Sequence, residues 1–259
     1  MCTTASLPRF LVILTNDCSV NDIVNPGWGW ATYLLPYIDQ ANLYNELNVG
    51  NVSVVCGMPL GAQLTSGGNA DLQKTAIPAF ICPTDTGPAL TPSRSPAHPA
   101  TPGSHAKSNY AGVAGYDYDG IEAVTGVRGF MVDGTQGTSR MRSIVDGSSN
   151  TLAVGEKIRI DLDDNEQSQS SSAGEKYGSQ WIGIAPDTRS ATINQPLRAT
   201  GTFAINGGSS NAFTSRHVGG ILFLVADGSV HFLSENMDQE LASFMAMTND
   251  GEIAPIGGQ

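Results

Sequence analysis

The clearest alternation of apolar and polar positions lies near the C-terminus, where two apolar runs, residues 221–226 and 229–233, flank the pair Asp227-Gly228. Both central residues of a two-residue type I′ turn need a positive φ, which Asp and Gly tolerate well. The pattern therefore predicts a tight β-hairpin with Asp227 and Gly228 as its turn.

The length of this turn fixes which side chains share a face of the hairpin. If Ala226 faces Ser229, Val225 pairs with Val230 and Phe223 with Phe232. The predicted core face then carries five apolar side chains: Ile221, Phe223, Val225, Val230 and Phe232. The other face is mixed, and we expect a loop or a partner to cover it: Leu222, Leu224, Ser229, His231 and Leu233.

Helical patterns precede and follow the β-rich middle of the chain. After the hairpin, Asn236 can cap a helix and Gln239 stands at the capping-box position, ahead of an apolar stripe. Near the start, residues 28–47 place apolar side chains on one side of two short helices that break near Pro36.

Short β-type runs, at residues 109–113, 129–132 and 151–155, are expected to be strands. Six of the 14 prolines fall between Pro83 and Pro102, which excludes regular structure there. The prediction is an α+β fold, an antiparallel sheet with short helices and long loops. We expect one domain over residues 27–259, with residues 1–26 as a separate segment.

The composition narrows the classes of partner. The chain has 259 residues, of which 40% are hydrophobic, enough for a sizeable core. Its 13 basic and 24 acidic residues give a net charge of −11, without a basic cluster to neutralise phosphates, so we expect no nucleic acid partner. The apolar run Phe10 to Leu14 is too short for an export signal or a membrane span.

The four cysteines, Cys2, Cys18, Cys56 and Cys82, contain no C-x-x-C pair. Neither a zinc ribbon nor a thioredoxin-type redox site is therefore expected. Two alternatives stay open: a disulfide between Cys56 and Cys82, or buried free thiols.

Six short motifs occur in a characteristic order along the chain. The most distinctive is His217 followed, after nine residues, by Asp227-Gly228. The others are Gly27-Trp28-Gly29-Trp30 with Leu34-Leu35-Pro36-Tyr37, Cys82-Pro83-Thr84-Asp85, Ser108-Asn109-Tyr110-Ala111-Gly112, Asp146-Gly147-Ser148-Ser149-Asn150-Thr151, and Val154-Gly155-Glu156. Together they resemble the prepilin-type H-X9-DG domain family of planctomycetes, catalogued as domain of unknown function 1559.

This resemblance implies a pilin-like fold and a pseudopilin-like role. It suggests a structural or assembly protein of the cell surface or of a type II secretion system, extracytoplasmic and not an enzyme, with protein partners or self-assembly. The N-terminal Gly-Phe-Thr-Leu-x-Glu start and long apolar helix of such proteins are absent from this sequence. A solute- or glycan-binding module is the alternative function.

The signature residues themselves do not form a catalytic pair in the predicted hairpin. Along an extended strand, His217 and Asp227 stand at opposite ends of the hairpin. We therefore expect Asp227 to shape the turn and His217 to hydrogen-bond a carboxylate near residues 235–238. Common nucleophile and nucleotide-binding motifs are also absent from the sequence.

Two further groups of residues suggest ligands. Oxygen-rich loops suit calcium: Asp161, Asp163 and Asn165 have partial calcium-loop spacing, and Asp117 and Asp119 form a shorter acidic turn, although solvated loops would look the same. Zinc is not predicted, because the four histidines show no helical H-x-x-x-H spacing. Trp28, Trp30, Tyr33 and Tyr37 could form a sugar platform, with Trp181 nearby; core packing is the alternative we favour.

Overall fold

The computed structural model describes residues 11–12, 28–49, 72, 74–87, 89–91, 105–113, 115, 129–131, 140–158, 179–182, 193–194, 205–207 and 212–256. Its strands are β1 (Leu11–Val12), β2 (Trp28–Gly29), β3 (Leu90–Thr91), β4 (His105–Ser108), β5 (Tyr110–Val113), β6 (Leu152–Glu156), β7 (Ser179–Gln180), β8 (Ile193–Asn194), β9 (Gly220–Val225) and β10 (Val230–Ser234). Its helices are α1 (Ala41–Glu46) and α4 (Gln239–Met245), with 3₁₀ turns η1 (Trp30–Tyr37), η3 (Pro78–Phe80) and η5 (Met141–Ser143).

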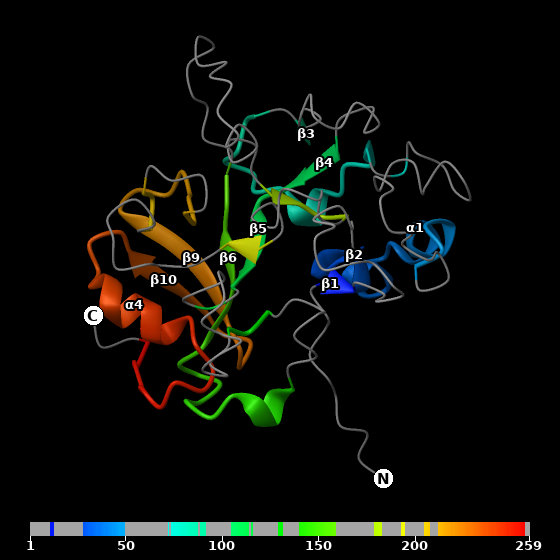
Figure 1. Ribbon diagram of the computed structural model, residues 1–259. Coiled ribbons are helices and arrows are strands. Elements are labelled where there is room, and N and C mark those ends of the chain that lie inside the picture. The colour runs from blue at the N-terminus through cyan, green and yellow to red at the C-terminus, as the bar shows by residue number, and fades with distance from the viewer. Residues whose placement is uncertain are drawn as a thin grey trace, which may run out of the picture.

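A five-stranded sheet in the order β10-β9-β6-β5-β8 organises the fold (Figure 1). The first four strands pair antiparallel, and β8 joins β5 in parallel. Short strands form a two-stranded β1-β2 sheet and a three-stranded β3-β4-β7 sheet. The predicted α+β class is confirmed.

The central sheet packs on both faces. One face, together with α4, builds a buried cluster around Phe213, Phe223, Ile221 and Met245. The other face contributes Val154 to a second cluster around Trp30 and Trp181. Strand β6 is buried along its whole length because it lies between these two layers.

The predicted hairpin exists, but its turn is one residue longer than expected. The N–H of Gly228 donates to the carbonyl of Val225, and the N–H of Val225 donates to the carbonyl of Ser229. Only Gly228 has a positive φ, 92°, whereas a type I′ turn would need one at Asp227 as well. The loop therefore has three residues, 226–228, and Gly228 forms the bulge that closes it.

This extra residue shifts the register and reverses the faces of β10. Val230 pairs with Leu224 and Phe232 with Leu222, so the predicted pairing of Val230 with Val225 is wrong. Because side chains alternate along a strand, a slip of one residue moves the whole set to the other face. Leu233 is buried in the core, whereas Val230 and Phe232 are exposed.

Most other predicted elements lie close to their expected places, but β3 (Leu90–Thr91) lies within the proline-rich stretch where no regular structure was expected. The two N-terminal helices break after Tyr37, and Pro36 stays inside η1. Helix α4 is capped by Asp238, whose carboxylate accepts from the N–H groups of Glu240 and Leu241, so Asn236 is not the cap. Residues 129–131 are described without strand structure, contrary to expectation.

Among the described residues, no helix combines the length and the apolar character needed to cross a membrane.

Candidate functional site

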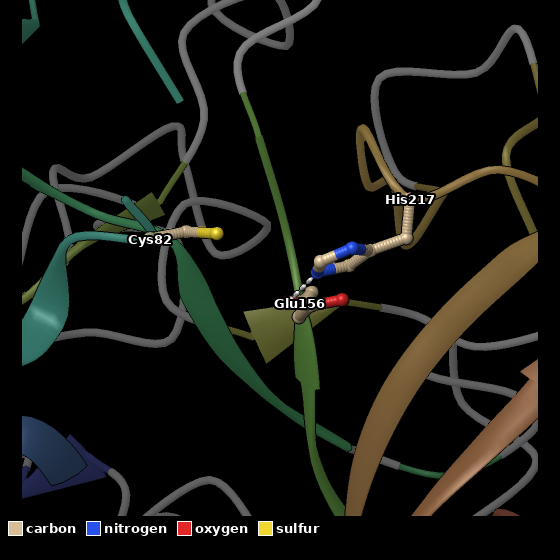
Figure 2. A group of neighbouring side chains, drawn as sticks. All are labelled: Cys82, Glu156 and His217. Atoms are coloured by element: carbon tan, nitrogen blue, oxygen red, sulfur yellow. Dashed lines mark hydrogen bonds and ion pairs between the residues drawn. The ribbon is translucent and has the colours of Figure 1, made fainter. Parts of the chain in front are cut away.

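Three side chains with metal-binding or acid-base chemistry converge beside the central sheet. Cys82, Glu156 and His217 each offer one ligand atom, and these atoms all lie within 4.8 Å of one another. Figure 2 shows the Cys82 thiol and the His217 ring approaching from opposite sides, with Glu156 between them. A thiol, a carboxylate and an imidazole in this arrangement are a set that borderline-soft divalent metals accept.

Glu156 is the central member of this cluster. It ends β6, is buried, and directs its two carboxylate oxygens to different segments. Oε1 lies 3.2 Å from Nε2 of His217, and Oε2 accepts a 3.0 Å hydrogen bond from the N–H of Leu222 in β9. Both oxygens are therefore held in place, which fixes the orientation of the carboxylate.

A glycine one residue earlier lets the histidine segment approach β6. A Cβ on Gly155 would collide with the rings of Phe213 and Phe223, which pack edge to face with centroids 5.0 Å apart. With Phe213 seated there, the N–H of Thr214 donates to the carbonyl of Glu156. The chain then continues three residues to His217, beside the Glu156 side chain.

A buried polar network positions the turn that carries Cys82. The N–H of Cys82 donates to Oδ1 of Asn109 over 2.8 Å, and Nδ2 of Asn109 donates to Asp85 over 2.6 Å. Asp85 also forms a 2.8 Å ion pair with Lys107, whose side chain is itself buried. The thiol of Cys82 is free, buried and 3.0 Å from the hydroxyl of Thr84, which favours the free-thiol alternative; Cys56 lies outside the described residues.

The surroundings of the polar network and of the cluster shift the pKa values of Asp85 and Tyr110 in opposite directions. Burial alone would raise the pKa of the Asp85 carboxyl, but hydrogen bonds from Lys107, Gly87 and Asn109 and the charge of Lys107 outweigh it and lower that pKa. Tyr110, the cross-strand neighbour of Glu156, has a raised pKa, because its half-buried side chain is partly removed from water and interacts with Cys82 and Glu156.

The motif that begins at Asp146 fastens the C-terminal segment. Both carboxylate oxygens of Asp146 accept hydrogen bonds of 3.0 Å, from the N–H groups of Asp250 and Gly251. Thr151 Oγ1 donates to the carbonyl of Gly147 over 3.1 Å. These residues hold the turn that follows α4 against the sheet.

The signature residues His217 and Asp227 have different partners, as predicted. Asp227 accepts from the backbone N–H and the hydroxyl of Ser229 within the hairpin loop. His217 does contact a carboxylate, but that carboxylate belongs to Glu156 and not to residues 235–238.

The aromatic residues proposed as a sugar platform do not share one exposed surface. Trp30 is buried against Phe80, and Trp181 is fully buried with its Nε1–H donating to the carbonyl of Thr75. Tyr33 is half-buried, Tyr37 is 84% exposed, and Trp28 lies in β2. The two described tryptophan side chains therefore belong to the core.

The five residues proposed for calcium, Asp117, Asp119, Asp161, Asp163 and Asn165, lie outside the described residues.

The sequence reasoning missed the Cys82–Glu156–His217 cluster. Local histidine spacing carries no signal for this cluster, because its three side chains come from segments separated by up to 135 residues, from position 82 to position 217. A signal was present, because each of the three stands in a different family motif. Each of these motifs contributes one side chain that can bind a metal, which would have grouped Cys82, Glu156 and His217 as a candidate site.

Comparison with known proteins supports the domain family that these motifs suggest. Residues 14–240 match the profile of a family described as "Protein of unknown function (DUF1559)". No curated protein and no solved structure matches the chain. Since the match covers most of the 259 residues, the chain belongs to the DUF1559 family.

Proposed function

We propose that this chain is a non-catalytic structural or assembly protein that acts outside the cytoplasm and associates with copies of itself. The proposal extends its resemblance to the prepilin-type H-X9-DG proteins of planctomycetes, which implies a pseudopilin-like role at the cell surface or in a secretion system. The observation that carries it is the exposed apolar face of the β9–β10 hairpin.

The motif residues support a structural role because they act inside the fold. Asp85 and Asn109 hold the Cys82 turn, Asp146 holds the C-terminal segment, and Glu156 joins His217 to β9. These contacts join segments that lie far apart in the sequence, as expected of residues that stabilise a fold.

The exposed face consists of Leu222, Leu224, Val230 and Phe232 on two adjacent strands. Val230 is 60% exposed and Phe232 is 50% exposed. Val230 pairs with Leu224 and Phe232 with Leu222, so the four side chains form one continuous apolar patch. A contiguous patch of this kind on a folded protein indicates an interaction surface.

Strand β10 is also the edge of the central sheet within the described part of the chain. Natural edge strands are protected by lysine, proline or inward-pointing charge, and Val230-His231-Phe232-Leu233-Ser234 contains none of these. An unprotected edge beside an apolar face suits antiparallel pairing with the β10 of a second copy. Such a two-fold contact is self-complementary.

The solution mass of the chain as a function of concentration tests this proposal. We expect dimers or larger assemblies in sedimentation equilibrium, strengthened by salt, because copies with a net charge of −11 repel one another. The double variant Val230→Lys/Phe232→Lys should be monomeric.

Val218→Lys/Ile253→Lys is the matched control, since it also places two lysines at exposed apolar positions, with Val218 98% exposed, but outside strands β9 and β10. A wild-type chain that stays monomeric at all concentrations, or two double variants that behave alike, would rule out assembly through this surface. Fractionation of producing cells tests the extracytoplasmic location separately.

A further inference from the structure

The Cys82–Glu156–His217 cluster has the composition of a metal site. Its three side chains provide sulfur, oxygen and nitrogen ligands from the loop after η3, the end of β6 and the turn before β9. Zinc is bound in proteins by these three ligand types, and three protein ligands leave a fourth position open, which water or substrate occupies in zinc enzymes. Calcium and magnesium select oxygen ligands alone, so a thiol argues against them.

The charges of the cluster fit a divalent cation. Glu156 is buried, and its hydrogen-bond partners are the N–H of Leu222 and the His217 ring, neither of which carries a permanent charge. By contrast, the neighbouring buried carboxylate of Asp85 has the ammonium of Lys107. With a thiolate at Cys82 and a neutral His217, the cluster would carry two negative charges, which a Zn²⁺ ion would neutralise.

The distances are close to those a bound ion requires. Tetrahedral zinc with ordinary bond lengths places its ligand atoms roughly 3.3 to 3.6 Å apart. The Glu156 oxygen and the His217 nitrogen are already 3.2 Å apart, and no pair of ligand atoms exceeds 4.8 Å. A movement of about 1 Å at the thiol would complete the geometry.

Outer contacts hold the ligands in place. The backbone of Cys82 is fixed by Asn109, the thiol lies 3.0 Å from the Thr84 hydroxyl, and Oε2 of Glu156 accepts a hydrogen bond from the N–H of Leu222. Such second contacts orient ligands in metal sites. The His217 side chain is 35% exposed, so an ion can enter on its side.

We propose that Cys82, Glu156 and His217 bind one Zn²⁺ ion, which ties the Cys82 turn to β6 and to the segment that leads into β9. This inference goes beyond the proposed function, because it concerns a site away from the β10 edge. The test of the zinc site does not depend on whether the chain self-associates.

Cobalt and zinc binding to the metal-free chain tests the proposal. Titration with Co²⁺ should give thiolate-to-cobalt charge-transfer absorption together with the visible bands of a tetrahedral ion. Competition between the chain and a chromophoric chelator should then give one zinc per chain and its affinity.

Two variants assign the ligands. His217→Asn changes a partly exposed residue and retains a polar group beside Glu156, so it should fold; Cys82→Ser changes one atom of the buried thiol. We expect each to weaken zinc binding by more than about 100-fold, since even outer contacts change metal affinity by 10- to 100-fold. Cys82→Ser should also abolish the charge-transfer band. Circular dichroism checks that both variants fold.

His231→Asn is the matched control for His217→Asn, because His231 interacts with Ser229 in the hairpin and lies outside the cluster. It should bind zinc as the wild type does. The proposal is overturned if the wild type gives no charge-transfer band, or if folded His217→Asn and His231→Asn bind zinc equally well. A Cys82 thiol that reacts quickly with iodoacetamide, at a rate unchanged by zinc, would also overturn it.

Discussion

Nε2 of His217 lies 3.2 Å from Oε1 of Glu156, although 61 residues separate them in the chain. The same carboxylate accepts from the N–H of Leu222, which lies five residues beyond His217. One buried side chain thus fastens both the segment before β9 and β9 itself to the end of β6. This explains how the histidine of the signature can contribute to the fold without contacting Asp227.

Removing the Glu156 carboxylate should destabilise the metal-free protein. Glu156→Ala leaves the partly buried N–H of Leu222 and the partly exposed His217 ring without their acceptor, which should cost about 1 kcal/mol, the lower end of the range for an unsatisfied buried group. We expect the free energy of unfolding to fall by this amount in urea denaturation with a chelator present. Glu252→Ala removes an exposed carboxylate and should change it by less than about 0.5 kcal/mol. Equal losses would contradict the structural role of Glu156.

Gly155 should tolerate no side chain. A methyl group there meets the buried rings of Phe213 and Phe223, and overpacking of a core typically costs about 1–3 kcal/mol. Gly155→Ala should lower the free energy of unfolding accordingly. Shrinking the nearest ring provides the control: in a double-mutant cycle, Phe223→Leu should make Gly155→Ala less costly. Additive effects of the two substitutions would show that the ring is not the obstacle.

Gly228 should be needed for its backbone conformation alone. Its φ is 92°, and the position that a Cβ would occupy has no contact within 4 Å, so any cost of a side chain comes from strain. We expect Gly228→Ala to lose about 1–2 kcal/mol of unfolding free energy. Gly228→Asn should lose less, because asparagine visits positive φ more readily. An alanine variant as stable as the wild type would contradict the three-residue turn.

The hairpin shows how far local sequence patterns determine this fold. The Asp227-Gly228 pair predicts a reversal at the right place, and the apolar runs predict its two strands. The choice between two and three loop residues depends on whether Asp227 also adopts a positive φ, and both turns accept the same residues. The core decides between them by burying Leu233 and leaving Val230 exposed.

The candidate site illustrates a different limit. Local spacing finds metal ligands that share a helix or a loop, whereas Cys82, Glu156 and His217 meet only after the sheet has formed. Their juxtaposition depends on Phe213 packing over Gly155 and on Asn109 holding the Cys82 backbone. Such long-range packing leaves no periodic trace in a single sequence.

Neutralising only one member of the buried ion pair between Asp85 and Lys107 should lower the free energy of unfolding strongly. Asp85→Asn leaves the Lys107 ammonium buried without its counter-charge, and loss of one partner of a buried pair costs about 3–5 kcal/mol. Adding Lys107→Met removes the stranded charge, so the double variant should be more stable than Asp85→Asn alone in urea denaturation. Asp227→Asn, at an exposed turn carboxylate, should change the free energy of unfolding little. A double variant less stable than Asp85→Asn would contradict this account.

The same pair predicts how stability depends on pH. Since the pKa of the Asp85 carboxyl is lowered from its ordinary 3.8 in the folded chain, the unfolded chain binds the proton more readily. The stabilisation from Asp85 is therefore fully present above the ordinary pKa and is lost as the pH falls through the lowered value. We expect the gap in unfolding free energy between the wild type and the Asp85→Asn/Lys107→Met variant to stay constant from pH 7 to about pH 5 and to shift against the wild type in more acid solution. Urea titrations at each pH measure this gap, and a gap that stays constant below the ordinary pKa would show that Asp85 titrates alike in the folded and unfolded chains.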